Sequence, residues 1–261
     1  MERGSLQALI FDVDGTLAET EHEGHRVAFN QAFREAGLDW TWDEATYASL
    51  LKVTGGRERI LRFIADLPAA ARPREDPQAL ASRLHARKTE IFQRLLRSGR
   101  IPLRPGVARL LREARGAGLR LAVATTTSAG NVEALLEANL GPGSLGWFEV
   151  IAAADLAPVK KPAPDVYRVV LARMGLRGRD CIAIEDSRNG LLAARGAGVS
   201  VVVTVSHYTR GEDFTGALVV LDGLGEPEHP VRVLQGDLDG FEYVNVEALQ
   251  WLWRRAETTR P

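Results

Sequence analysis

The sequence has one cysteine, few aromatic residues and almost no net charge. Among its 261 residues, 7% are aromatic, and the formal net charge is -1. A single cysteine excludes a disulfide framework within the chain, and the balanced charge provides no field that would attract nucleic acid or an anionic membrane. No apolar run is long enough to span a bilayer, and the short run before Asp12 is not a signal peptide. We therefore expect a cytoplasmic monomer without a nucleic-acid or membrane partner.

The rest of the composition is that of an ordinary globular protein. Hydrophobic residues make up 45% of the chain and charged residues 26%. The length suffices for one large α/β domain and a smaller inserted domain.

The most informative segment is Leu9-Ile10-Phe11-Asp12-Val13-Asp14-Gly15-Thr16. A short apolar run followed by turn residues predicts a buried strand that ends just before Asp12. In open α/β sheets, ligands bind at the carboxyl ends of the strands. Asp12 and Asp14 repel each other, so a divalent cation is their natural partner. The alternative is a surface turn.

From residue 103 onward, strands alternate with helices. Apolar runs at 119–124, 150–153, 181–184 and 199–205 are separated by segments of helical periodicity. This alternation predicts βαβ units and a parallel sheet, and the continuous apolar runs indicate a sheet covered on both faces. Residues 227–240 carry little signal, and the role of 227–261 stays open.

Residues 20–97 contain helical patterns and no convincing strand. A capping-box pattern, Thr41 to Glu44, predicts a helix over 42–51, and a long helix is expected from Asp76 to Leu96. The sequence thus predicts a Rossmann-like α/β core, 1–19 with 98–261, and an inserted α-helical cap, 20–97.

Four predicted strands end in groups suited to phosphate chemistry. These groups are Asp12 with Asp14, Thr125, Lys161, and Glu185 with Asp186. Parallel strands bring their carboxyl ends to one edge, so these groups are expected to converge. Taken singly, each has an ordinary alternative, namely a solvated lysine, a helix cap or a turn; together they favour one site.

The chemistry of phosphoryl transfer explains these residue types. Asp12 would attack phosphorus to give an aspartyl-phosphate, while Asp14 would protonate the leaving oxygen and later activate water. Lys161 and the Thr125 hydroxyl would bind phosphoryl oxygens. Mg²⁺ would neutralise the charge of these oxygens, and its ligands would be Asp12, the carbonyl of Asp14 and Asp186.

A second anion site is predicted in the helical segment. Gly55 and Gly56 precede a predicted helix, and Arg57, Arg59 and Lys88 supply positive charge. Bare N–H groups and guanidinium forks suit a phosphate. The alternative is a glycine turn between helices with solvated arginines.

These motifs resemble the haloacid dehalogenase superfamily of phosphohydrolases. Residues 11–17 look like its first motif, Thr125 its second, Lys161-Pro162 its third and residues 185–190 its fourth. The resemblance implies Mg²⁺ dependence, Asp12 as nucleophile and Asp14 as acid/base. It also implies metal ligation by Asp12, Asp14 and Asp186, with Glu185 in support. Asp14 argues against carbon–halogen chemistry, since true dehalogenases lack it.

Residues 20–97 resemble the helical cap of the β-phosphoglucomutase-like branch, and segments 19–26 and 54–59 resemble CbbY-type phosphatases within it. Such caps close over the substrate. This resemblance implies a sugar-bisphosphate substrate such as xylulose 1,5-bisphosphate, an inhibitor of the Calvin-cycle carboxylase Rubisco. We expect Glu21 to bind sugar hydroxyls and Thr126 to contact substrate.

A mutase remains an alternative. In the mutase, a hinge-helix histidine helps orient the acid/base; ungapped alignment puts Gly24 there, with His25 one place later. One residue turns a helical side chain by about 100°, which favours a phosphatase unless the helix is irregular. A sugar-phosphate sensor without catalytic activity is a further alternative.

Overall fold

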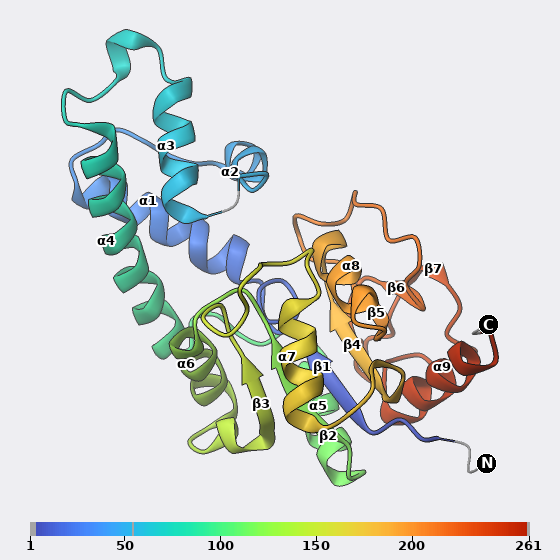
Figure 1. Cartoon of the computed structure of the whole chain (residues 1–261). Coiled ribbons are helices and arrows are strands. Elements are labelled where there is room, and N and C mark those ends of the chain that lie inside the picture. The colour runs from blue at the N-terminus through green and yellow to red at the C-terminus, as the bar shows by residue number, and fades with distance from the viewer. Residues whose placement is uncertain (1–3, 54, 260–261) are drawn as a thin grey trace. The chain divides into compact units, whose positions relative to one another are not determined.

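The computed structural model describes residues 4–53 and 55–259, and the chain divides into two compact units (Figure 1). One unit comprises residues 1–19 with 102–261, and the other residues 20–101. The second junction lies at 101/102 and not at 97/98. Ile101 is fully buried and lies beside Gly24 and Phe92 of the helical unit, so the chain leaves that unit only after it.

The core unit is built on a seven-stranded sheet in the order β3-β2-β1-β4-β5-β6-β7. Its strands are β1 (Ala8–Phe11), β2 (Arg120–Ala124), β3 (Phe148–Ala152), β4 (Cys181–Glu185), β5 (Ser200–Thr204), β6 (Val219–Leu221) and β7 (Val233–Gly236). All neighbours are parallel except β6 and β7. The α/β prediction is confirmed.

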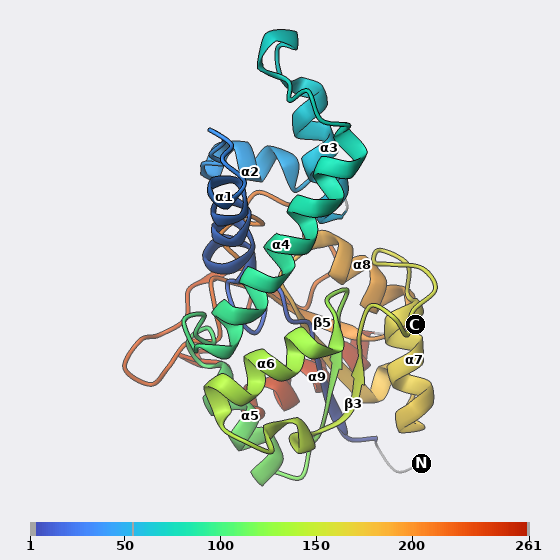
Figure 2. The ribbon, with the colours of Figure 1, turned by 90° about the vertical axis from the view of Figure 1, so that its left-hand side faces the viewer.

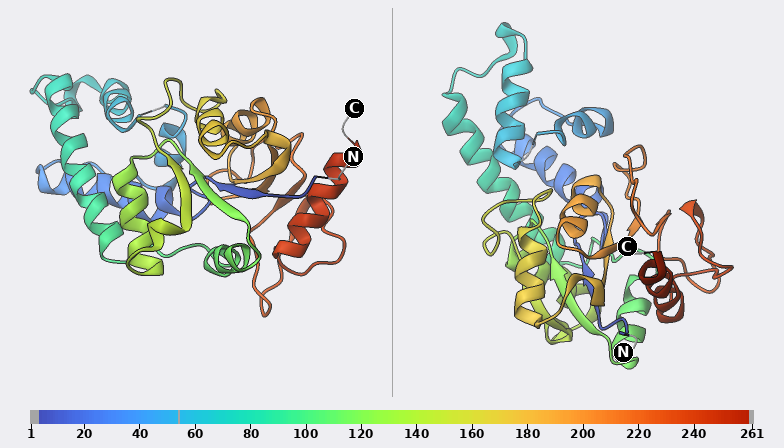
Figure 3. Two further views of the ribbon diagram at one scale, coloured as in Figure 1. Left: turned by 60° about the horizontal axis from the view of Figure 1, so that its bottom comes forward. Right: turned by 45° about the vertical axis from the view of Figure 1, so that its right-hand side comes forward.

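Helices cover both faces of this sheet (Figure 3). They are α5 (Val107–Gly116), α6 (Ala129–Leu140), α7 (Asp165–Met174), α8 (Arg188–Gly196) and α9 (Val246–Thr259). One core cluster joins Ala8 and Ile10 of β1 to apolar side chains of α7 and α8, while α5 and α9 lie on the opposite face. Because both faces are buried, every residue of β1 and β4 is buried, and apolar residues follow one another without alternation up to Glu185 at the end of β4.

The helical unit consists of η1 (Thr20–His25), α1 (Arg26–Glu35), α2 (Glu44–Leu50), α3 (Gly56–Asp66) and α4 (Pro77–Arg97). Helix α4 packs along α1 and α3 (Figure 2). Phe29, Phe33 and Trp42 are fully buried and form an aromatic core there. The unit therefore has its own hydrophobic core.

Three local features differ from the predictions. The cap of α2 is Asp43, whose side chain accepts from the Thr46 N–H at 2.8 Å, and not Thr41. Strand β7 lies within 227–240, and all four of its residues are exposed, so burial imposes no hydrophobic pattern on its sequence. Segment η1 is a π-helix. The argument that His25 is out of phase with the mutase histidine assumed a regular α-helix, so it does not hold here.

None of the helices in the described part of the chain is both long and apolar enough to span a membrane.

Candidate active site

The predicted groups follow neighbouring strands. Asp12 follows β1, Thr125 follows β2, Lys161 lies in the loop after β3, and Glu185 ends β4 directly before Asp186. Since β3, β2, β1 and β4 are adjacent and parallel, these groups emerge at one edge of the sheet.

Three carboxylates meet at that edge. Asp12, Glu185 and Asp186 each provide an oxygen within 4.8 Å of the other two. All three side chains are buried, and Glu185 is completely inaccessible to solvent. The distance that the metal hypothesis required between Asp12 and Asp186 is therefore met.

Lys161 lies between two of these carboxylates. Its Nζ donates to Asp12 Oδ1 and to Glu185 Oε1, both at 2.6 Å. Burial disfavours the ammonium, but the charges of Asp12 and Glu185 outweigh this effect and raise the pKa of Lys161. Lys161 therefore stays charged at the point where phosphoryl oxygens would carry negative charge.

Burial and repulsion between carboxylates disfavour the ionised forms of Glu185, at the end of β4, and of Asp186, which follows it. Burial raises the pKa of Glu185 to about 7, although Lys161 opposes the shift. Burial, and then repulsion from Asp12 and Glu185, raises the pKa of Asp186 well above its usual range. The cluster thus holds more negative charge than Lys161 balances.

A divalent cation fits this donor set. The ligands are hard carboxylate oxygens, as Mg²⁺ prefers, and Glu185 Oε2 is buried without a hydrogen-bond partner among the described residues. A bound cation would neutralise the buried negative charge and would coordinate the unsatisfied oxygen.

The turn after β1 brings Gly15, the residue that follows Asp14, against Asp186. Gly15 has φ 87°, and a Cβ there would lie 2.1 Å from Asp186 Oδ2. Only glycine allows both this conformation and this approach.

The threonines after β2 differ in exposure. Thr125 is buried, and its hydroxyl accepts from the Thr127 N–H at 3.2 Å. Thr126 is exposed at the start of the loop to α6.

Tyr167 was not predicted from the sequence. It is fully buried on α7, and its hydroxyl donates to Glu185 Oε1 at 2.5 Å. In the sequence it is an aromatic residue on the apolar face of a helix, so only its contact with Glu185 indicates a role.

The helical unit contains a separate polar cluster. Tyr47 donates to Glu21, and Arg59 donates to the Tyr47 hydroxyl at 3.2 Å and lies 3.7 Å from Glu21. Tyr47 was also missed, because the sequence presents it as a core aromatic residue.

The predicted anion-binding residues lie around His25 and His85. Lys88 is buried, and its Nζ lies 2.7 Å from His25 Nδ1. Burial, then Lys88 and Arg59, hold the pKa of His25 well below its usual range. His25 is thus part of a partly buried contact with Lys88.

Arg57 and the two glycines open helix α3. Arg57 Nη2 donates to Gln78 at 2.5 Å, and its Nε is buried without a partner among the described residues. Gly55, at φ 101°, is the N-cap, and a Cβ on Gly56 would lie 2.8 Å from the His85 ring. Burial and neighbouring cations, Lys88 first among them, lower the pKa of His85.

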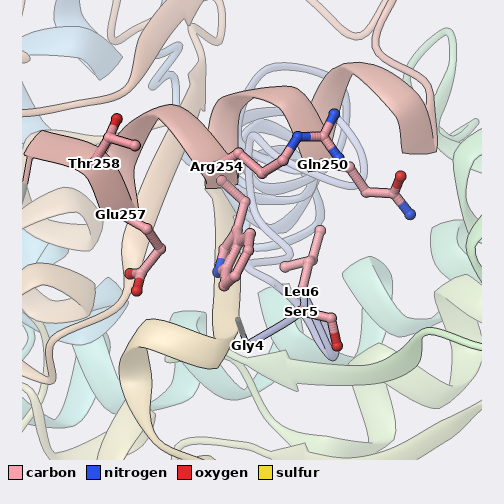
Figure 4. Close-up of a pocket in the computed structure, with 8 residues that line it drawn as sticks. Gly4, Ser5, Leu6, Gln250, Arg254, Glu257 and Thr258 are labelled. Carbon is pink, nitrogen blue, oxygen red and sulfur yellow. The ribbon is translucent and has the colours of Figure 1, made fainter. Parts of the chain in front are cut away.

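A separate pocket of about 460 Å³ lies at the other end of β1 (Figure 4). It is lined by Gly4, Ser5, Leu6, Gln250, Trp253, Arg254, Glu257 and Thr258. These residues precede β1 or belong to α9, whereas the carboxylates follow the strand ends. The pocket is therefore not part of the candidate active site.

A mostly parallel sheet with buried carboxylates and a lysine at its carboxyl edge defines an α/β protein of Rossmann-like fold whose site suits phosphate chemistry. Comparison with known proteins specifies the family. The family model for haloacid dehalogenase-like hydrolases matches residues 6–198. The chain belongs to this family, and the prediction of a hydrolase is confirmed.

Its relatives include proteins named CbbY. The plasmid-encoded CbbY of Cupriavidus necator is 51% identical over 228 residues, covering 87% of this chain and 89% of the relative. A crystal structure of CbbY from Rhodobacter sphaeroides in complex with phosphate has a TM-score of 0.74 at 49% identity and covers 84% of this chain and 94% of that one.

A second crystal structure of the same R. sphaeroides protein holds xylulose 1,5-bisphosphate. It is of a variant with asparagine in place of one aspartate, and its TM-score is 0.74 at 48% identity, with the same coverage of both chains.

Proposed function

We propose that this protein is a Mg²⁺-dependent phosphatase of sugar bisphosphates. The observation that carries the proposal is the buried cluster of three carboxylates around Lys161 at the carboxyl edge of the sheet. Similarity to the R. sphaeroides protein that was crystallised with xylulose 1,5-bisphosphate supports that compound as substrate.

In this proposal, Asp12 is the nucleophile. Lys161 holds Oδ1 of Asp12, and we assign Oδ2 to the attack on phosphorus. The phosphorus–oxygen ester bond breaks as the aspartyl-phosphate forms, and Asp14 gives its proton to the leaving alkoxide. Asp14 then accepts a proton from the water that attacks phosphorus, which releases inorganic phosphate and regenerates Asp12.

Mg²⁺ would be held by Asp12, the Asp14 carbonyl and Asp186, with Glu185 in support. Bound there, the ion would neutralise charge on the phosphoryl oxygens. Lys161 binds and orients the same oxygens, and the Thr125 hydroxyl and Thr126 contribute polar contacts.

For the second phosphate we propose the cationic cluster of the helical unit. Arg57, Arg59 and Lys88 all act electrostatically on His85, whose lowered pKa reflects their positive field as well as burial. The unpartnered Nε of Arg57 and the N-terminus of α3 add donors. Tyr47 and Arg59 contact the Glu21 carboxylate and hold it in place, and we assign Glu21 to the binding of sugar hydroxyls.

The test is a phosphate-release screen over sugar mono- and bisphosphates, with Mg²⁺ and with a chelator. We expect preference for bisphosphates, loss of turnover with chelator, and loss of at least about 1,000-fold in Asp12→Asn, because nucleophile removal costs orders of magnitude. Turnover close to wild type in folded Asp12→Asn would remove Asp12 from the nucleophile role.

A β-phosphoglucomutase-like transfer is the second candidate, and the π-helix favours keeping it. The irregular turn of η1 removes the argument that His25 is out of phase with the mutase histidine. Product analysis separates the two: inorganic phosphate marks hydrolysis, and an isomerised sugar phosphate marks transfer.

A further inference from the structure

Arg104 is a buried arginine of the core unit that none of the steps above employs. Its side chain is only 9% exposed, and its guanidinium donates to four backbone carbonyls. They belong to Gly15, Thr204 at 3.0 Å, Val205 at 2.7 Å and Asp222 at 3.2 Å. One side chain thus ties together the turn after β1 and the ends of β5 and β6.

The bond to Gly15 acts on the turn that carries Asp14. Asp14 directly precedes Gly15, and the Gly15 backbone packs so closely on Asp186 that a Cβ would meet its carboxylate. A shift of the Gly15 carbonyl therefore moves the backbone from which the Asp14 side chain projects.

The bonds to Thr204 and Val205 act on the other flank of Asp186. Ser206 follows Val205, and it lies beside Asp186 against Gly15: a Cβ on Gly15 would lie 2.1 Å from Asp186 Oδ2 and 3.1 Å from Ser206 Cβ. Arg104 therefore links the two segments that enclose Asp186.

Arg104 is itself held in place on two sides. Its backbone N–H donates to the Leu17 carbonyl at 2.8 Å, and the preceding residue, Leu103, forms an antiparallel β-bridge with Ala18. Its Nε lies 3.5 Å from Glu19, which also accepts from the His207 N–H at 3.3 Å. The guanidinium is thus a rigid brace and not a solvated charge.

We propose that Arg104 is a positioning residue that holds the Gly15 turn so that Asp14 is aligned with the leaving oxygen. This inference rests on the proposed phosphatase reaction. The planar fork of arginine reaches several carbonyls at once, whereas a lysine is a point charge on a flexible stem. Arg104→Lys keeps the charge and loses the brace.

The test compares kcat/KM on two esters that differ in their need for a proton. p-Nitrophenyl phosphate has a leaving group that departs without protonation, whereas a sugar phosphate needs the general acid. The value of kcat/KM reports the step that forms the aspartyl-phosphate. We expect Arg104→Lys to lower kcat/KM on the sugar phosphate by about 10- to 100-fold, within the range of general acid catalysis. The loss of kcat/KM on p-nitrophenyl phosphate should be at least tenfold smaller.

The matched control is Arg109→Lys. Arg109 makes comparable bonds, to Gly225 O at 2.8 Å, Val244 O at 3.0 Å and Glu226 at 2.8 Å, away from the carboxylates. The Arg109→Lys variant should have a lower melting temperature than the wild type but the same ratio of the two kcat/KM values.

The outcomes separate the two proposals. Wild-type protein without phosphate release on any ester would overturn the proposed function. Active wild type with equal losses on both esters in Arg104→Lys, or with no loss, would overturn the positioning role alone. If neither Arg104→Lys nor Arg104→Gln folds, Arg104 serves the fold, and the positioning proposal is likewise overturned.

Discussion

Lys161 is the residue on which the carboxylate cluster depends most. Its side chain is 7% exposed, and its ammonium contacts Asp12 and Glu185 at equal distances. Removing one partner of a buried ion pair leaves an uncompensated charge and costs about 3–5 kcal/mol. Lys161, which we propose binds the phosphoryl oxygens, thus also stabilises the carboxylate cluster in the fold.

Tyr167 permits a smaller change at the same site. Tyr167→Phe deletes only the hydroxyl that donates to buried Glu185. A hydrogen bond to a charged group is worth about 1.5–3 kcal/mol, so we expect urea unfolding to show a loss of that size. We also expect kcat to fall about tenfold and KM to change by less than about twofold, because Glu185, the partner of Lys161, is then held less firmly. Unchanged kcat and stability would show that the hydroxyl does not orient Glu185.

At the scale of elements, the approach of α8 to β4 decides the shape of the site. Gly190 is the third residue of α8, and a Cβ there would lie 1.8 Å from Glu185 Oε2. Ser187 caps the helix by accepting from the Gly190 N–H at 3.2 Å. The helix therefore begins directly against the buried carboxylate.

Gly190→Ala should displace Glu185 or shift α8. Overpacking of this kind costs about 1–3 kcal/mol, and we expect phosphate release to fall together with the free energy of unfolding. The matched control is Gly116→Ala at the end of α5, where an added Cβ meets no atom within 4 Å and stability should stay the same or rise by about 0.4–1 kcal/mol. A Gly190→Ala enzyme as stable and active as Gly116→Ala would contradict this packing argument.

At the scale of the whole molecule, the two units have different kinds of polar interior. The core unit buries carboxylates around one lysine, whereas the helical unit buries a lysine beside a histidine. Histidine burial makes stability depend on pH near neutrality.

The contribution of His25 to stability should fall on acidification below about pH 6.5, whereas Glu185 and Asp186, whose pKa values are raised in the folded state, contribute in the opposite direction. Burial, then Lys88, Arg59 and His85, lower the pKa of His25 in the folded state. The unfolded chain therefore takes up a proton at this histidine that the folded chain does not bind. The His25 contribution to the free energy of unfolding decreases by up to about 1.4 kcal/mol per pH unit below the unfolded pKa and is constant above it.

The measurement is urea unfolding between pH 5 and pH 8. His25→Gln keeps an acceptor for Lys88 without titrating, so it should reduce the loss of stability on acidification relative to the wild type, while His85, whose pKa is also lowered, retains its share. His229→Gln, at an exposed position, should leave it as in the wild type. Equal slopes in wild type and His25→Gln would assign the acid sensitivity to other groups.

Much of the fold and of the candidate site follows from local patterns. Asp12, Lys161, Glu185 and Asp186 were predictable because each follows an apolar run, and parallel strands place such positions at one edge. Tyr167, Tyr47 and Arg104 were not, because an aromatic residue or an arginine carries no mark of its partner in its own neighbourhood. Strand β7 was missed for the opposite reason, since its exposed residues have no burial pattern.

The sequence alone determined the class of this protein, because strand periodicity and the residues after each strand are local properties. Only the tertiary structure decided which of these residues touch: that Lys161 joins Asp12 to Glu185, that Lys88 faces His25, and that Arg104 braces the turn after β1. Hydrogen bonds and charge interactions act over a few ångströms in space, and residues as far apart as 12 and 161 reach that range only when the sheet has formed.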